Sequence, residues 1–179
     1  TNNTAAEDGG AINGGTATDC IFTENSANSG GAMTNGTAVN CNFTGNSANS
    51  GGAIANGTAV NCNFTKNAAA ENGGAAYDVK ASNCIFRENS AKIGGAMYNG
   101  TAKNSSFTLN TAENGTPDMY SVNMPDDDCT FNVPVLKVSS LNTTYGNNDK
   151  LNFNLTFGSV TYSLETCNAT PKSFLSLFS

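Results

Sequence analysis

The side chains that could carry out acid/base chemistry in this chain are carboxylates, because the sequence contains no histidine. Hydrolysis of a glycosidic bond needs two carboxylates on one surface, about 5–9.5 Å apart. In the repeat described below, Asp19 shares its position with asparagines, and Glu24 and Glu88 are separated by two units that carry Gly45 and Lys66. No two acids fall on adjacent repeats of one column, so we predict no catalytic residue. The acids considered are Asp19, Glu24, Glu71, Asp78, Glu88 and Glu113.

Cysteines are the second group with chemical potential, and most of them recur at one place in the repeat. They lie a full repeat or more apart, and this wide spacing excludes a local CxxC metal clamp. A disulfide framework and a stack of small buried side chains both remain open. We favour the stack, because neighbours in a column present nearly parallel Cβ vectors, which suit a disulfide poorly. The series is Cys20, Cys41, Cys62 and Cys84, continued by Ser105 and Cys129, while Cys167 is unassigned.

Two other motifs could hold a ligand. The run Asp126–Asp128 could supply oxygens to calcium, but we prefer a solvated loop in a decaying repeat. The Gly-Gly pairs could suggest a phosphate loop, but they lack the strand-loop-helix setting and the GK[ST] ending. We therefore predict no metal site and no cofactor.

These residues are set in a short repeat, with a period of roughly 21 residues that is typical of stacked-repeat proteins. Each unit opens on a double glycine: Gly9-Gly10, Gly30-Gly31, Gly51-Gly52, Gly73-Gly74 and Gly94-Gly95. Each also carries a phenylalanine, namely Phe22, Phe43, Phe64, Phe86 and Phe107. An asparagine stands at a fixed place after each phenylalanine, at Asn25, Asn46, Asn67, Asn89 and Asn110. A unit this short cannot bury its own apolar face, so it must stack on its neighbours.

The repeat favours strands over helices. Val60, Cys62 and Phe64 alternate with polar residues, and this period of two indicates a strand with one buried face. We predict an all-β fold, a right-handed parallel β-helix of about six turns over residues 1–132. Turns would lie about 4.8 Å apart and stack Cys, Phe and Asn side chains into columns. The glycines would adopt positive φ at the tightest corner.

The ends of the sequence depart from the repeat. After Asn114, Pro117 and Asp118 replace the expected Gly-Ala. From Val135 the alternation around residues 146–148 suggests antiparallel strands, so we predict that residues 133–179 are a partial Ig-like β segment, cut short. The chain also starts partway through a repeat unit, and we expect it to be a fragment of a longer protein.

Composition narrows the function classes. The net charge is −6 and the eight Lys and Arg residues are scattered, which argues against nucleic-acid binding. No stretch approaches the ~20 apolar residues of a membrane-spanning helix, so we predict no membrane-spanning segment. Eleven Asn-x-Ser/Thr sequons are compatible with a glycosylated exterior.

The motif GGA-[IM], together with F-x-x-N, resembles the repeats of the polymorphic outer-membrane autotransporters of chlamydiae. It resembles at least as closely the adhesin-like surface proteins of methanogenic archaea, in which Ig-like modules carrying T-T-Y-G, here Thr143–Gly146, follow the β-helix. The resemblance covers residues 3–131, and more weakly 135–157. It implies surface display and adhesion, and it carries over no ligand residues. The motif stands at Gly9–Ile12, Gly30–Met33, Gly51–Ile54 and Gly94–Met97.

We therefore expect a non-catalytic, extracellular adhesin or stalk segment on a cell surface, with the export signal outside this segment. Its expected partners are surface glycans or proteins of host or partner cells. The alternative is a carbohydrate-active β-helix enzyme, either a polysaccharide lyase or a glycoside hydrolase. Ice binding through flat threonine columns is a third class, which we disfavour because Arg87 and Lys80 interrupt the columns.

Overall fold

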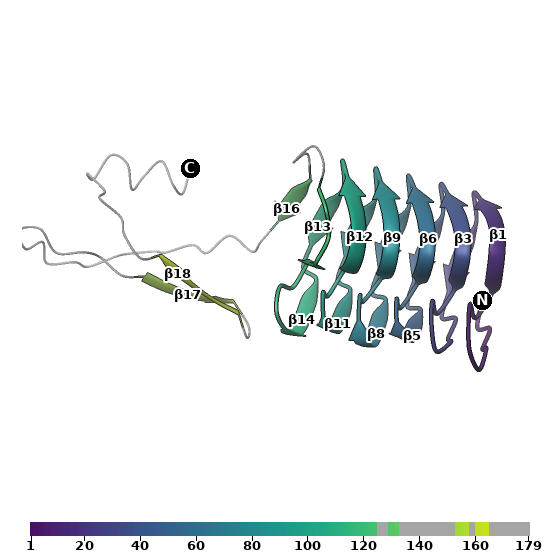
Figure 1. The fold of residues 1–179 in the computed structure, drawn as a ribbon, viewed down its shortest axis with the longest axis horizontal. Helices are drawn as coiled ribbons and strands as arrows, with labels where there is room; N and C mark the ends of the chain where they lie inside the picture. Colours follow the sequence, from purple (N-terminus) through teal and green to yellow (C-terminus); the bar gives the residue numbers. More distant parts are fainter. Residues whose placement is uncertain (125–128, 133–152, 158–159, 165–179) are drawn as a thin grey trace, which may run out of the picture. The chain divides into compact units, whose positions relative to one another are not determined.

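The computed structural model describes residues 1–124, 129–132, 153–157 and 160–164 (Figure 1). The chain divides into two units, Thr1–Pro134 and Val135–Ser179. Strands and no helices occur among the described residues, as the all-β prediction requires. Asp126–Asp128, Thr143–Gly146 and Cys167 lie outside them, so the calcium interpretation, the Ig-like motif and the role of this cysteine stay predictions.

The first unit is a parallel β-solenoid of about six turns, in which each strand pairs with the equivalent strand of the next turn (Figure 1). Sheet 1 contains β1 (Ile12–Thr18), β3 (Met33–Val39), β6 (Ile54–Val60), β9 (Ala76–Ser82), β12 (Met97–Lys103) and β15 (Met119–Tyr120). Sheet 2 contains β2 (Ile21–Thr23), β4 (Asn42–Thr44), β7 (Asn63–Thr65), β10 (Ile85–Arg87), β13 (Ser106–Thr108) and β16 (Thr130–Asn132). Sheet 3 contains β5 (Ser47–Ser50), β8 (Ala68–Asn72), β11 (Ser90–Ile93) and β14 (Thr111–Asn114).

The phenylalanine column runs through the core as predicted. Phe43 pairs with Phe22 on one side and with Phe64 on the other. From Phe22 to Phe131 the successive ring centroids lie 4.8 to 5.3 Å apart, and the rings are nearly parallel. The rings from Phe43 to Phe107 are completely buried. Stacking at the strand spacing therefore forms the apolar spine of the solenoid.

The repeat that begins at Gly51 is longer than its neighbours by a single position, and sheet 3 accommodates the difference. The register of β5 against β8 shifts between its first and last pairs, which are Ser47 with Ala68 and Ser50 with Asn72. The extra residue therefore lies in β8 as a β-bulge, which makes that strand longer than β5. The columns of the other two sheets keep their register.

Each turn bends at residues in the left-handed region. In the second turn these are Gly30, Asn35, Asn40 and Gly45, with φ between 53° and 64°. The prediction of positive φ is confirmed for the first glycine of each pair, and each turn has three further corners. At Gly45 a side chain is tolerated, because Lys66 and Glu88 occupy the same place in later turns.

One of these corners corrects the predicted facing of Val60. The alternation predicted that Val60, Cys62 and Phe64 share the inner face. Cys62 and Phe64 are completely buried, but Val60 is partly exposed on the outer face. The left-handed residue Asn61, at φ 54°, separates β6 from β7 and breaks the alternation between them.

In the second unit the described residues form a two-stranded antiparallel sheet. β17 (Phe153–Phe157) pairs with β18 (Val160–Leu164), from Phe153 opposite Leu164 to Phe157 opposite Val160. The antiparallel strands that the sequence predicted around residues 146–148 lie outside the described residues and stay a prediction.

Candidate functional site

The six candidate acids lie in separate places on the solenoid surface, and most have cationic or amide partners. Glu88 contacts Arg87 at 2.9 Å and Lys66 at 3.6 Å. Glu71 lies 3.3 Å from Lys92. Such exposed ion pairs contribute little to stability.

The two aspartates among these acids sit at corners. Asp19 accepts a hydrogen bond from the amide of Asn40 at 3.1 Å, and Asp78 accepts one from Asn99 at 3.3 Å. Glu24 and Glu113 are exposed. In the described part of the chain no hydrogen bond joins two of the six acids.

The cysteines form the stack that the repeat predicted, and Cys20, Cys41, Cys62 and Cys84 in it are free thiols. The Cys20 amide donates to the Cys41 sulfur at 3.4 Å, and the Cys41 thiol donates to the Val39 carbonyl at 3.2 Å. Burial raises the pKa of the Cys41 thiol. A hydrogen bond with Cys62, and then burial, raise the pKa of Cys84. Cys41 and Cys84 are therefore neutral, weakly hydrogen-bonded core groups, poorly suited to act as nucleophiles.

This stack makes a prediction about thiol reactivity. The three central cysteines, Cys41, Cys62 and Cys84, should react with iodoacetamide at pH 7.5 at least about tenfold more slowly in the folded protein than after unfolding, because alkylation requires local opening. Half-buried Cys20 provides an internal comparison. Peptide mass spectrometry after a short pulse measures the labelling. Labelling of all four cysteines at the unfolded rate would contradict the buried stack.

A buried asparagine ladder runs beside the phenylalanines. The Asn67 amide nitrogen donates to Asn89 Oδ1 at 3.0 Å and to the Phe43 carbonyl at 3.0 Å. Its Oδ1 accepts from both the backbone N–H and the side-chain amide of Asn46, at 3.0 and 2.9 Å. The same pattern recurs at Asn46 and Asn89, and no buried side-chain N or O in the described residues lacks a partner. These amides are fully used inside the protein.

Asp118 ends this ladder. Its Oδ1 accepts a hydrogen bond from the Asn110 side-chain amide at 2.9 Å, in the role that the next asparagine plays in earlier turns. Burial raises the pKa of Asp118, although the hydrogen bond from Asn110 opposes this shift. A raised pKa in the folded state means that the ionised carboxylate destabilises the fold at neutral pH, and that this penalty disappears as the pH falls.

We therefore expect Asp118→Asn to stabilise the protein at pH 7. The neutral amide keeps an oxygen acceptor for Asn110 and removes the cost of burying a charge. The gain in melting temperature should shrink as the pH falls towards 3.8, the ordinary pKa of the carboxyl. Asp78→Asn, at an exposed corner, is the matched control. A gain that is equal at pH 7 and at pH 3.5 would contradict the assignment.

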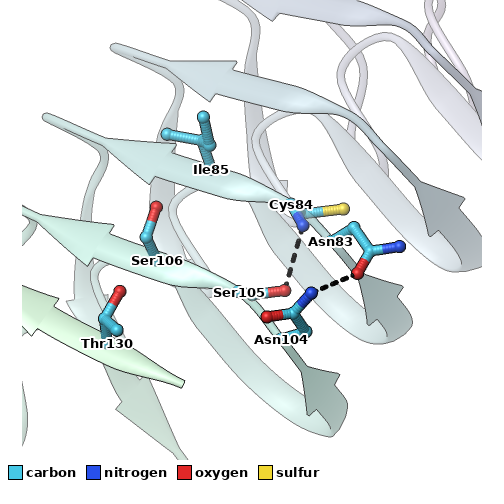
Figure 2. Close-up of a pocket in the computed structure, with 7 residues that line it drawn as sticks. All are labelled: Asn83, Cys84, Ile85, Asn104, Ser105, Ser106 and Thr130. Carbon is cyan, nitrogen blue, oxygen red and sulfur yellow. Dashed lines mark hydrogen bonds between the residues drawn. The ribbon is translucent and has the colours of Figure 1, made fainter. Parts of the chain in front are cut away.

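An open hollow of about 240 Å³ lies where β10 and β13 begin (Figure 2). Ser105 Oγ accepts the backbone N–H of Cys84 at 3.1 Å, and the Asn104 amide donates to Asn83 Oδ1 at 2.7 Å. No carboxylate or cationic side chain lines it, so its described walls suit a small uncharged polar molecule. The lining residues are Asn83, Cys84, Ile85, Asn104, Ser105, Ser106 and Thr130.

A surface column of tyrosines was not predicted from the sequence. Tyr77, Tyr98 and Tyr120 are the second residues of β9, β12 and β15 and occupy one register position of sheet 1. Their ring centroids lie 5.5 and 5.3 Å apart, with interplanar angles of 6° and 14°. Their spacing matches the repeat period, so the sequence could have revealed the column. Thr34 and Ala55 occupy the equivalent positions of earlier turns, and this change of residue type concealed the column.

Comparisons with models of protein families, with curated proteins and with solved structures found no match. Within the described part of the chain, no helix has the length and apolar character needed to cross a bilayer. The same residues contain no cluster of three or more His, Cys, Asp or Glu side chains that could hold a metal ion.

Proposed function

We propose that this chain is a non-catalytic segment of an extracellular, cell-surface adhesin-like protein, built from a right-handed β-helix and a partial Ig-like module. Its role is to present a rigid surface that binds glycans or proteins of partner cells. One observation carries the proposal: side chains of one kind repeat on the surface from one turn to the next, as Tyr77, Tyr98 and Tyr120 do in sheet 1. A surface that repeats one weak contact at fixed spacing gains avidity for a partner that also repeats.

The placement of the acids supports binding over catalysis. Glu88 and Glu71 are engaged with lysine or arginine, and Asp19 and Asp78 with asparagine amides. A carbohydrate-active enzyme needs two carboxylates facing one substrate at about 5–9.5 Å. That enzyme is the alternative function, and it would have to use acids outside these contacts.

The test is a panel of neutral and acidic polysaccharides incubated with the purified chain. Retention of the chain and release of new reducing or unsaturated ends are scored in the same wells. We expect retention on at least one polysaccharide, with no release. Release that disappears in a single Asp or Glu variant would replace the adhesin with an enzyme, and absence of both signals would leave a stalk without glycan binding.

A further inference from the structure

The rings of the tyrosine column stack on one another, but their hydroxyl groups make no hydrogen bonds with other described residues. None of the hydroxyls of Tyr77, Tyr98 and Tyr120 has a hydrogen-bond partner among the described residues. No buried side-chain oxygen of the described residues lacks a hydrogen-bond partner. Because the hydroxyls of half-buried Tyr77 and Tyr98 have no partner, they must reach the surface. Tyr120 is 45% exposed. Three phenol groups therefore stand at one-turn intervals, each able to donate and accept a hydrogen bond.

This column differs from the polar columns at the corners. The exposed asparagines at Asn40, Asn61 and Asn83 donate their amides to one another along the solenoid. Their donors are therefore engaged within the protein. Tyrosine also adds a rigid apolar ring with few rotatable bonds, which lowers the entropy lost on binding and makes this residue common in recognition surfaces.

From this geometry we propose that the tyrosine column is the binding site for an uncharged polysaccharide lying along the solenoid axis. Sugar hydroxyls contact the three phenol oxygens, and sugar C–H groups contact the ring edges. This inference rests on the proposed adhesin function and names the class of its ligand. A linear glycan suits the site because it presents hydroxyl groups repeatedly along its length, as the column does.

Charge and backbone pairing select this ligand over others. Asp78 follows Tyr77 in the chain, and the chain carries a net charge of −6, so an acidic polysaccharide would be repelled. A peptide commonly binds by adding a strand to an open sheet edge. β9 and β12 are paired on both sides, between β6 and β15, and offer no edge beside Tyr77 and Tyr98.

The test compares two multiple variants of the full chain by affinity electrophoresis through galactomannan, hydroxyethyl cellulose and, as the acidic probe, polygalacturonate. Tyr77→Phe, Tyr98→Phe and Tyr120→Phe together remove the hydroxyls and keep the stacked rings. Thr37→Val with Thr58→Val removes two half-buried hydroxyls from another outer column of sheet 1 and is the matched control. Thermal unfolding of each variant verifies the fold.

We expect the triple Phe variant to bind the retained neutral polysaccharide at least about tenfold more weakly, since three hydrogen bonds are lost. The Thr variant should bind within twofold of the wild type. Because the chain has no tryptophan, tyrosine emission reports on the site directly. In a Tyr145→Phe, Tyr162→Phe background, bound glycan should protect the remaining three tyrosines from acrylamide quenching.

Three results would overturn this inference. If the triple Phe variant binds as the wild type does, the tyrosine site is wrong while the adhesin proposal stands. Retention by polygalacturonate instead of the neutral probes would contradict the ligand class. If no probe retains the wild-type chain, both the tyrosine site and glycan binding are rejected.

Discussion

Replacing Gly74 with alanine is expected to abolish the folded solenoid. A Cβ at this position would overlap the Gly95 carbonyl oxygen and lie 2.6 Å from the Ser90 carbonyl oxygen. Both atoms belong to the backbone, one in the next glycine pair and one in β11, so neither can move without disturbing the stacking of turns. The expected loss of unfolding free energy exceeds about 4 kcal/mol, a size that is typical of severe core or backbone disruption. Circular dichroism during urea unfolding measures it.

Gly45→Lys is the matched control for this substitution. Gly45 has φ +64°, and the nearest atom to an added Cβ is Glu24 Cγ at 3.7 Å. Lys66 occupies the equivalent corner with φ 56°, so the backbone there accepts a lysine side chain. We expect a loss of no more than about 1–2 kcal/mol, the usual cost of left-handed φ outside glycine. A Gly74→Ala protein with the wild-type urea midpoint would contradict the close stacking of turns.

Removing Asn67 from the buried ladder is expected to have the second-largest effect. Asn67→Ala leaves the backbone N–H and the side-chain amide of Asn46 without their acceptor. It also removes the donor to Asn89 Oδ1 and to the Phe43 carbonyl. Each buried polar group left unpaired costs about 1–3 kcal/mol, so the sum should reach roughly 3–6 kcal/mol after partial relaxation. Chemical unfolding of the wild type and the variant gives this difference.

The control for this substitution is an exposed asparagine of the same repeat. Asn63 lies on the outer face of β7 and donates to Asn42 Oδ1 at 2.9 Å. Ser106 occupies the equivalent place two turns later, so Asn63→Ser should change stability by no more than about 0.5 kcal/mol. Equal losses at Asn67 and Asn63 would mean that the buried ladder does not hold the turns together.

The repeat period was sufficient to predict the core of the solenoid. Because one turn equals one repeat, residues at the same place in successive units must stack, and Phe64 does lie between Phe43 and Phe86. The same reasoning anticipated the asparagine and cysteine columns. It also led us to expect no two acids as neighbours in one column, which stays a prediction.

The glycine corner was predicted, but the corner that Gly45 occupies in the second turn was not, because residue type does not encode it in the later turns. Lys66, Glu88 and Leu109 adopt left-handed φ, a region that L residues other than asparagine and glycine seldom enter. Stacking on neighbouring turns determines their conformation. For the same reason the period-two interpretation failed at Val60, where the intervening corner at Asn61 changes which face the chain presents.

The candidate surface was hidden by variation between repeats. Tyr77 and Tyr98 follow Thr34 and Ala55 at one register position, so the column emerges only when the turns are placed side by side. The role of Asp118 was equally invisible, because its hydrogen bond to Asn110 forms where the repeat decays. The sequence therefore predicts contacts where the repeat is regular, and it does not predict them where the repeat decays and tertiary contacts determine the structure.

The claim that the solenoid binds repeating glycans without cleaving them is tested most directly by titrating the chain with length-graded neutral oligosaccharides. Isothermal titration calorimetry gives the affinity, and chromatography of the recovered sugar gives its length. We predict that affinity rises with oligosaccharide length until the glycan spans the tyrosine column, because each added contact is made at high effective concentration. The recovered sugar should be unchanged. Affinity independent of length, or shortened products, would contradict this account.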